Sequence, residues 1–332
     1  MQSRDGSDRV GRERVAAIQR GRIIAAMLEV CAEVGAANVS VAPVVERAGV
    51  SRRTFYELFK DCEDCLLAAI DETVERVAAA VVPAWRADGR WRERTRASLT
   101  ELLHALDDDL VSGRLLIVDT LGAGHRALER RRNVLAHAIA AIDDGRDETK
   151  NGAHASALTA EGVVGGVASV LHARLLDGSK RSLLDLAGPL MSMIVLPYLG
   201  PAAARRELER PAPKPRKRDK HALAATDDPL REVGMRLTHR TVLVLSAIAD
   251  APGASNRQVG KTAGIEDQGQ ISKLLSRLQR LGLIRNDNLD GSTRGMPNAW
   301  TLTEKGERVH GVMSPREARE QERWYVAARD GG

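Results

Sequence analysis

The stretch Ser40–Phe59, SVAPVVERAGVSRRTFYELF, limits what this chain can fold into more than any other. It predicts two short helices joined by a tight turn, because Ser40 and Ser51 can each cap a helix start and Gly49 suits the left-handed backbone of a helix end. One apolar face of the first helix is formed by Val41, Val44, Val45 and Ala48. This arrangement indicates a helix-turn-helix, which places its second helix in the DNA major groove.

The second of these helices is expected to bury Phe55 and Phe59. Its outward side chains are then Arg52, Arg53, Thr54 and Tyr56. Arginine is suited to reading guanine O6 and N7, and a threonine methyl group can contact a thymine methyl group. A merely solvated helix face is the alternative interpretation of the two arginines.

Two longer helices are expected around this motif, one over Arg14–Val34 and one from about Cys62 to Val82, with Pro83 following. The whole arrangement resembles the tetracycline-repressor (TetR) family over about residues 14–70. The resemblance rests on Val41-Ala42, Ala48-Gly49-Val50-Ser51, Thr54-Phe55-Tyr56, Phe59, Glu63 and Leu66-Leu67.

The TetR resemblance implies roles for individual residues. It implies that Ser40 and Tyr56 contact DNA phosphates, and that the base edges are met by Arg52, Arg53 and Thr54. Cys62 departs from the pattern, since the family usually has a phosphate-binding lysine there. We expect Lys60 to supply that charge instead.

Cys62 and Cys65 form a CxxC pair, which can be a redox or metal motif. Zinc, however, needs three or four ligands, and only Cys31 and scattered histidines could complete a set. We therefore predict no metal site. The TetR resemblance places Cys65 where the family has a buried leucine, which implies a small core residue.

Residues 61–204 are expected to be helical throughout, over about 91–110, 113–124, 126–143, 154–177 and 180–199. The TetR resemblance implies that this is an effector-binding and dimerisation domain, which pairs with a second copy through residues of about 154–199. Candidate polar groups of the effector pocket are His104, Asp119, His125, His137 and His172, for which packed or surface positions are the alternative.

Nothing in the sequence favours catalysis, because no nucleophile–base signature, phosphate-binding loop or metal-ligand spacing occurs. The run Asp107–Asp109 could mimic a carboxylate site, but a solvated helix end is expected instead. We therefore predict no enzyme activity and no cofactor. No apolar run reaches a membrane-spanning length, and the N-terminus lacks an apolar signal core. The three cysteines make no disulfide framework. A cytoplasmic location is therefore expected.

Charge is unevenly distributed over the 332 residues. Residues 1–60 carry 10 basic and 7 acidic side chains, 61–204 carry 16 and 21, and 229–313 carry 12 and 8. Basic ends around an acidic middle are typical of two polyanion-binding modules that flank a third module, although solvated surfaces would also explain them. Residues 1–13 are expected to be a disordered basic arm.

A linker is predicted over residues 205–228, because Pro211, Pro213 and Pro215 favour an extended chain and the interleaved Lys and Arg keep it solvated. A plain tether is the simpler interpretation, and a linker that follows DNA is the alternative.

Residues 229–313 predict three helices, with caps at Thr238, Ser255 and Asp267, then two short strands and a final helix. LSRLQRLGLI (275–284) and WTLTEKG (300–306) resemble MarR-like winged-helix domains. If this module binds DNA, the expected contacts are Gln268, Gln270, Ser272, Lys273, Ser276, Arg277 and, in the wing, Arg294. A protein-interaction module is the alternative, and the tail 314–332 is unassigned.

The expected fold is therefore mainly α: a TetR-like helix-turn-helix (14–60), an all-helical domain (61–204) and an α+β winged-helix domain. The expected function is that of a transcriptional repressor which binds a pseudo-palindromic operator in double-stranded DNA as a homodimer. A small-molecule effector would release or modulate it, and the winged helix would be a second DNA-binding head. In the alternative, the winged helix contacts another protein and the regulator is scaffolded or independent of a ligand.

Overall fold

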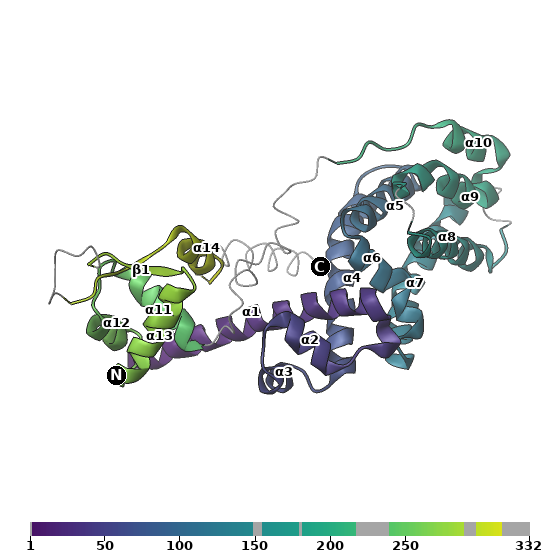
Figure 1. Cartoon of the computed structure of the whole chain (residues 1–332). Coiled ribbons are helices and arrows are strands. Elements are labelled where there is room, and N and C mark those ends of the chain that lie inside the picture. The colour runs from purple at the N-terminus through teal and green to yellow at the C-terminus, as the bar shows by residue number, and fades with distance from the viewer. Residues whose placement is uncertain (1, 149–154, 179–180, 217–238, 289–296, 314–332) are drawn as a thin grey trace. The chain divides into compact units, whose positions relative to one another are not determined.

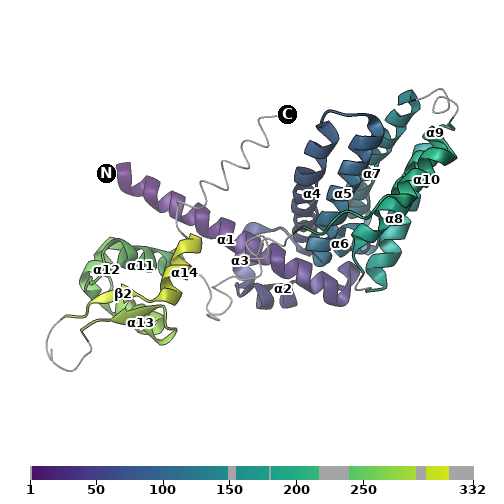
Figure 2. The same ribbon diagram turned by 90° about the horizontal axis from the view of Figure 1, so that it is seen from above.

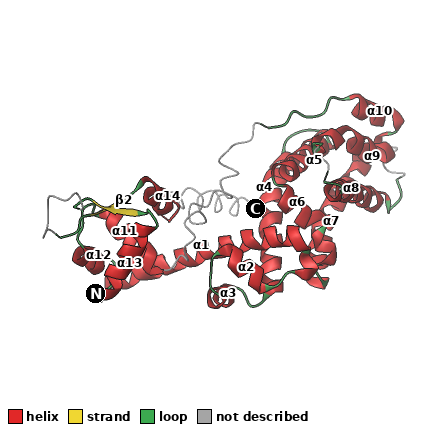
Figure 3. Ribbon diagram, viewed as in Figure 1, coloured by secondary structure: helices red, strands yellow, loops and turns green. Residues whose placement is uncertain are grey.

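The structure, a computed structural model, describes residues 2–148, 155–178, 181–216, 239–288 and 297–313. Helices make up most of these residues, and the two strands both lie in the C-terminal part (Figure 3). The chain divides into two compact units, one of residues 24–44 and 59–219 and the other of residues 1–23, 45–58 and 220–332. The first is called the helical unit below.

Helix α1 runs from Gln2 to Val34. Residues 2–13, expected to be disordered, are therefore helical, and that expectation was wrong. The sequence offers a reason, since Asp5 and Arg9 carry opposite charges four residues apart, as do Asp8 and Arg12. This spacing stabilises a helix.

Helix α4 (Cys62–Arg86) begins as predicted, with the Asp61 carboxylate accepting the amide of Asp64 at 2.8 Å. Pro83 was expected to follow the helix but lies inside its last turn. A proline there costs one backbone hydrogen bond. The helix continues because Trp85, just beyond the proline, packs against the core of the helical unit.

The helical unit continues with α5 (Trp91–Asp108), α6 (Leu110–Ile117), the 3-10 helix η2 (Asp119–Gly122) and α7 (His125–Asp143). It then contains η3 (Asp144–Glu148), α8 (Thr159–Leu176), η5 (Leu183–Leu186), α9 (Ala187–Leu199) and α10 (Pro201–Glu209). Figures 1 and 2 show α4 beside α5, and α8, α9 and α10 side by side. The core between them includes Trp91, Leu103, Leu171, Met191 and Tyr198.

Asp107 and Asp109 have structural roles, so the expectation of a plain solvated helix end was wrong. Asp107 accepts the backbone amides of Leu183 (2.9 Å) and Leu184 (3.4 Å) and thereby fixes the start of η5. Asp109 caps α6. Aspartate is favoured at such positions because its carboxylate satisfies otherwise unpaired amides at a helix start.

The predicted linker does not begin at residue 205, because α10 extends to Glu209. Glu207 is almost completely buried and forms an ion pair with Arg96 of α5. Further on, Arg216 Nη2 lies 2.6 Å from both carboxylate oxygens of Glu101. Residues 201–216 are therefore fixed to α5 and α9, and the rest of the predicted linker lies outside the described residues.

The C-terminal module contains α11 (His239–Asp250), α12 (Asn256–Thr262), α13 (Gln268–Arg280), β1 (Ile284–Asn286), β2 (Trp300–Leu302) and α14 (Glu304–Met313). The strands are antiparallel, with Ile284 opposite Leu302. The predicted caps Ser255 and Asp267 are confirmed. This is the element order expected of a winged helix. Because each strand has only three residues, the assignment of this module as a winged helix stays a prediction.

Candidate nucleic-acid interface

Helices α2 (Val41–Ala48) and α3 (Arg52–Leu58) are joined by the predicted tight turn. Gly49 has φ 64°, in the left-handed region, and the amide of Val50 donates to the carbonyl of Val45 at 3.1 Å. A Cβ atom on Gly49 would also lie 3.1 Å from Arg22 Nη2. Glycine is therefore favoured at this turn by the backbone conformation, while a Cβ atom would also require the end of the Arg22 side chain to move slightly.

The start of α3 is fixed by Ser51, whose hydroxyl oxygen accepts the amide of Thr54 at 3.0 Å. The hydroxyl groups of Ser51 and Thr54 also lie 2.9 Å apart and share a hydrogen bond. This confirms the predicted cap. It also means that the half-buried Thr54 takes part in the cap, so its methyl group is the part best suited to a base contact.

The two faces of α3 differ as predicted. Phe55 is fully buried, whereas Arg52 and Arg53 are exposed and Tyr56 is 58% exposed. Arg53 Nε donates to Glu57 Oε1 at 2.8 Å, and this hydrogen bond and the charge of Glu57 raise the pKa of Arg53. The helix therefore presents two cations and a phenol to solvent, with one cation held by its neighbour.

Ser40 and Lys60 flank this surface in the sequence, and both side chains are exposed. The backbone amide of Lys60 donates to Asp64 Oδ2 at 3.0 Å, which fixes the chain just before α4 and leaves the ammonium group exposed. These positions fit the phosphate contacts expected of Ser40 and Lys60, and those contacts stay a prediction.

The three thiols do not form a reactive site. Burial raises the pKa of Cys31 to about 12, and burial and then the charge of Asp61 raise the pKa of Cys62. Cys62 Sγ lies 3.6 Å from the Val39 carbonyl oxygen and donates to it, while Cys65 is completely buried. Within the described ranges, no group of three His, Cys, Asp or Glu side chains could hold a metal ion.

The five candidate effector-pocket residues fall into two groups. His104 (α5) and Asp119 (η2) are buried and His172 (α8) is half-buried, whereas His125 and His137 lie exposed on α7 and do not suit a buried pocket within this chain. Burial raises the pKa of Asp119, against the opposing effect of Arg114, whose Nε lies 3.8 Å from the carboxylate. In the part of the chain described, no hydrogen bond or ion pair joins the five into one site.

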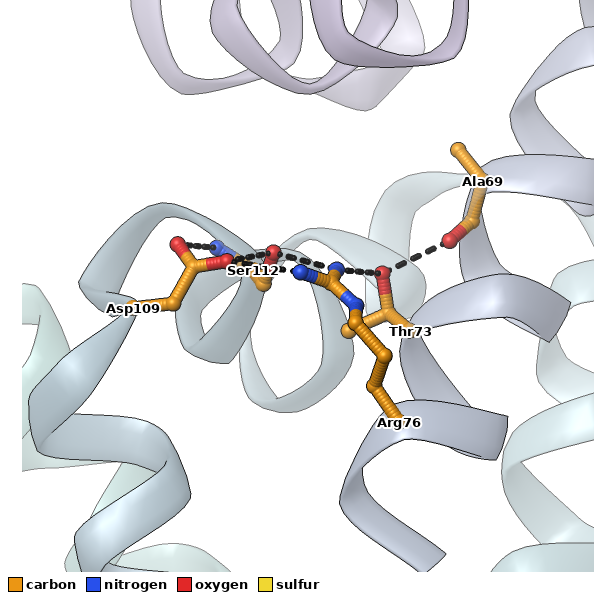
Figure 4. A network of polar contacts seen from close by, with 5 residues as sticks. All are labelled: Ala69, Thr73, Arg76, Asp109 and Ser112. Atoms are coloured by element: carbon orange, nitrogen blue, oxygen red, sulfur yellow. Dashed lines mark hydrogen bonds and ion pairs between the residues drawn. The ribbon is translucent and has the colours of Figure 1, made fainter. Parts of the chain in front are cut away.

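Sequence reasoning missed a polar network that joins α4 to α6 (Figure 4). The Arg76 guanidinium donates to Thr73 Oγ1 at 3.2 Å and Ser112 Oγ at 3.0 Å, and lies 3.2 Å from Asp109 Oδ2. Thr73 in turn donates to the carbonyl of Ala69 at 2.7 Å. Because Asp109 also caps α6, the network ties the start of that helix to the middle of α4.

The far end of α6 is held by α7. Arg131 Nη1 donates to the carbonyl oxygens of Leu116 (3.3 Å) and Ile117 (3.4 Å), and burial lowers the pKa of this arginine. A cation is favourable there, because the last carbonyl groups of a helix lack partners. Helix α6 is thus anchored at both ends by arginines from neighbouring helices.

Helix α13 of the C-terminal module also has one buried and one polar face. Ile271, Leu275 and Leu278 are completely buried. The predicted contact residues Gln268, Gln270, Lys273, Ser276 and Arg277 are exposed, and Ser272 is half-buried. Gln270 Oε1 accepts a hydrogen bond from Arg240 Nη1 of α11 at 2.9 Å. The predicted wing residue Arg294 lies outside the described residues.

The turn, the capped α3 and its exposed cations define residues 40–60 as a helix-turn-helix of the DNA-binding class. Comparison with known families gives the same result, since residues 23–69 match TetR_N, described as bacterial regulatory proteins, tetR family. A search of curated proteins found no match. None of the helices in the described residues is long and apolar enough to cross a membrane.

Two solved structures resemble about half of the chain. The fatty acid degradation regulator FadR from Bacillus halodurans shares 18% identity over 53% of this chain and 94% of its own, with a TM-score of 0.48. The transcriptional regulator FadR from Bacillus subtilis, in complex with stearoyl-CoA, shares 18% identity over 54% of this chain and 98% of its own, with a TM-score of 0.47.

Proposed function

We propose that the protein is a DNA-binding transcriptional repressor, not an enzyme, which acts as a homodimer on a pseudo-palindromic operator and responds to a small-molecule effector in its helical unit. The observation that carries the proposal is α3, with Phe55 buried and with Arg52, Arg53 and Tyr56 exposed, inside a segment that matches the tetR family. Such a helix can enter the major groove and present arginines to guanine edges.

Arg52→Ala tests this function. Genomic fragments retained by the native chain in a gel-shift assay should no longer be retained by the variant. The matched control is Arg86→Ala, which also removes an exposed arginine, here from the last turn of α4, outside the helix-turn-helix. Equal retention by the native chain and Arg52→Ala would refute α3 as the reading helix.

The dimer is proposed to form through α8 and α9. Small or apolar exposed residues of α8 recur three or four positions apart and so share one face: Leu158 (just before the helix), Gly162, Gly165, Ser169, Ala173 and Leu176. Leu158 is 67% exposed and Leu196, on α9, 47%. Exposed apolar side chains at helical spacing favour burial against a second copy.

Gly165→Glu tests this dimer. No atom lies within 4 Å of a Cβ placed on Gly165, so the change leaves the fold of one chain intact while placing a charge in the proposed interface. Light scattering should then show a monomer where the native chain is a dimer. The same substitution at Gly21, which also has open surroundings, is the control. A Gly165→Glu variant that stays dimeric would exclude this face.

The effector is proposed to bind in the helical unit, where His104 and Asp119 are the two buried candidates. Its response would be a shift between two dimer geometries with different affinity for DNA. A ligand that lowers DNA affinity of the native chain should have a weaker effect on His104→Leu.

The C-terminal module is proposed to be a second DNA-binding head, supported by exposed Lys273 and Arg277 on α13. Lys273→Ala combined with Arg277→Ala should weaken DNA binding and reduce its dependence on salt, since each phosphate contact adds to that dependence. The alternative is a protein-interaction module, which the same variant would reveal by leaving DNA binding unchanged.

A further inference from the structure

The hydrogen bonds of Asn256, the first residue of α12, fix the orientation of its amide. Trp300 Nε1, which can only donate, lies 2.6 Å from Asn256 Oδ1, and Asn298 Nδ2 donates to the same oxygen at 3.1 Å. A flipped amide would turn its NH₂ group toward these donors. Asn256 Nδ2 therefore points to Ser272 Oγ of α13, 3.3 Å away, and donates to it.

The same direction of donation continues on the other side of Asn298. Asn298 Oδ1 accepts from Asn286 Nδ2 at 2.7 Å, and Asn286 Oδ1 accepts the backbone amide of Ala299 at 2.9 Å. Three amide side chains thus link the paired strands β1 and β2 to α13, each donating to the next. Hydrogen bonds in series polarise one another and strengthen the last donor.

The last donor of this series is the hydroxyl group of Ser272. Its oxygen accepts from Asn256, so its own proton is directed away from that amide. Lys273, the next residue, and Arg277, five positions further along α13, are exposed cations. Lys273 and Arg277 are four positions apart and so share one face of α13, and Ser272 immediately precedes that face in the sequence. A hydroxyl donor on a helix with exposed cations suits an anionic oxygen, and on DNA that oxygen belongs to a phosphate.

We infer that Ser272 donates a hydrogen bond to a DNA phosphate and that Asn256 is the residue that positions this donor. The inference rests on the proposed function of the C-terminal module as a DNA-binding head. It adds a residue outside α13 to that head, and it assigns Ser272 to backbone contact instead of base reading.

Asn256→Asp tests the inference because it keeps the acceptor for Trp300 and Asn298 but sets a second acceptor opposite Ser272. The Ser272 hydroxyl must then donate inward to the carboxylate. We expect Asn256→Asp and Ser272→Ala each to weaken DNA binding by at least about ten-fold, the effect of one hydrogen bond to a charged group made by a single C-terminal module. The double variant should bind no more weakly than Ser272→Ala alone, because both changes remove the same contact.

The measurement uses the full chain with Arg52→Ala and Tyr56→Phe, which remove a base contact and a phosphate contact proposed for the N-terminal head. Binding to a random-sequence duplex at low salt is followed by fluorescence anisotropy. Gln258→Glu is the control for charge. It adds a negative charge to the same helix and keeps the capping box with Ser255, and it should weaken binding much less.

The outcomes separate the inference from the proposed function. Additive losses in the double variant, or no loss in Asn256→Asp, would overturn the role of Asn256 while Lys273→Ala with Arg277→Ala still weakens binding. If that basic-residue variant binds the duplex as well as its parent, the module is not a DNA-binding head, and both the second head and the Ser272 contact are refuted.

Discussion

Tyr56→Phe removes a proposed DNA contact while leaving the packing of the helix-turn-helix unchanged. Tyr56 is 58% exposed, and the substitution keeps its ring, which meets Phe55 edge to face at 5.4 Å between centroids. The free energy of unfolding should therefore change by less than about 0.5 kcal/mol. Only the phenolic hydroxyl group, the expected phosphate donor, is lost.

The loss of DNA affinity in Tyr56→Phe can be estimated from the one hydrogen bond that the hydroxyl group is expected to donate to a phosphate. A hydrogen bond to a charged group contributes about 1.5–3 kcal/mol, and a dimer makes it once per head, so about 3–6 kcal/mol is removed. This corresponds to a loss of about 10²- to 10⁴-fold in the dissociation constant. Fluorescence anisotropy with a retained genomic fragment measures the affinity, and thermal unfolding measures the stability.

Phe55→Ala is the contrasting variant at the adjacent position. Phe55 is completely buried, and such a truncation costs about 3–5 kcal/mol of stability, so this variant should lose folding and DNA binding together. The reasoning fails if Tyr56→Phe binds DNA as tightly as the native chain, or if it unfolds as early as Phe55→Ala.

Three further predictions concern other parts of the chain. Gly306→Ala should destabilise the C-terminal module by at least about 1–3 kcal/mol in thermal unfolding, because its Cβ would lie 1.9 Å from the Leu283 carbonyl oxygen. Gly311→Ala, on the same helix, is the control, since its Cβ meets open space and should not destabilise the module. Cys31 should resist a thiol reagent at pH 9 in the folded chain, since its pKa is raised to about 12, and rapid labelling would contradict its burial. Asp119→Asn should stabilise the chain at neutral pH, because burial raises the pKa of the Asp119 carboxyl group. The cost of its charge is absent below the pKa that this group has in the unfolded chain. It develops as the pH rises through the higher pKa that the group has in the folded chain. If the charge of Asp119 has no such cost, the unfolding temperatures of the native chain and of Asp119→Asn will differ by the same amount at every pH in that range.

The helix starts could be predicted from the sequence because their causes are local. Ser51, Asp61, Ser255 and Asp267 each accept an amide two or three residues ahead, so the side chain and its partner stand together in the sequence. The buried face of α3 could be predicted for the same reason, since helical periodicity places Phe55 inward.

Long-range contacts explain what the sequence did not reveal. Glu207 in the predicted linker is 111 residues from Arg96, its partner, and Asp107 is 76 residues from Leu183, whose amide it accepts. Asn256 is 44 residues from Trp300. In the sequence alone, a polar residue that bonds to a distant element looks the same as one in a solvated turn or linker. Composition therefore could not distinguish these two roles.

The helical unit holds α4 in a way that suits a proposed effector response. Three polar pairs join α4 to neighbouring elements: Glu63–Arg126 at 3.5 Å, Asp71–Arg130 at 3.1 Å and Arg76–Asp109 at 3.2 Å. All six side chains are between 36% and 52% exposed, so each pair contributes about 0–1 kcal/mol.

The sum of these pairs is at most about 3 kcal/mol, which lies within the usual range of coupling free energies between two sites. An effector that binds another arrangement of α6 and α7 more tightly by about 3 kcal/mol could therefore release all three pairs. Helix α4 would remain folded, because Leu66, Leu67 and Ile70 stay buried. Along the chain, α4 begins four residues after the end of α3, so the proposed response would arise in the element that follows the proposed reading helix in the sequence.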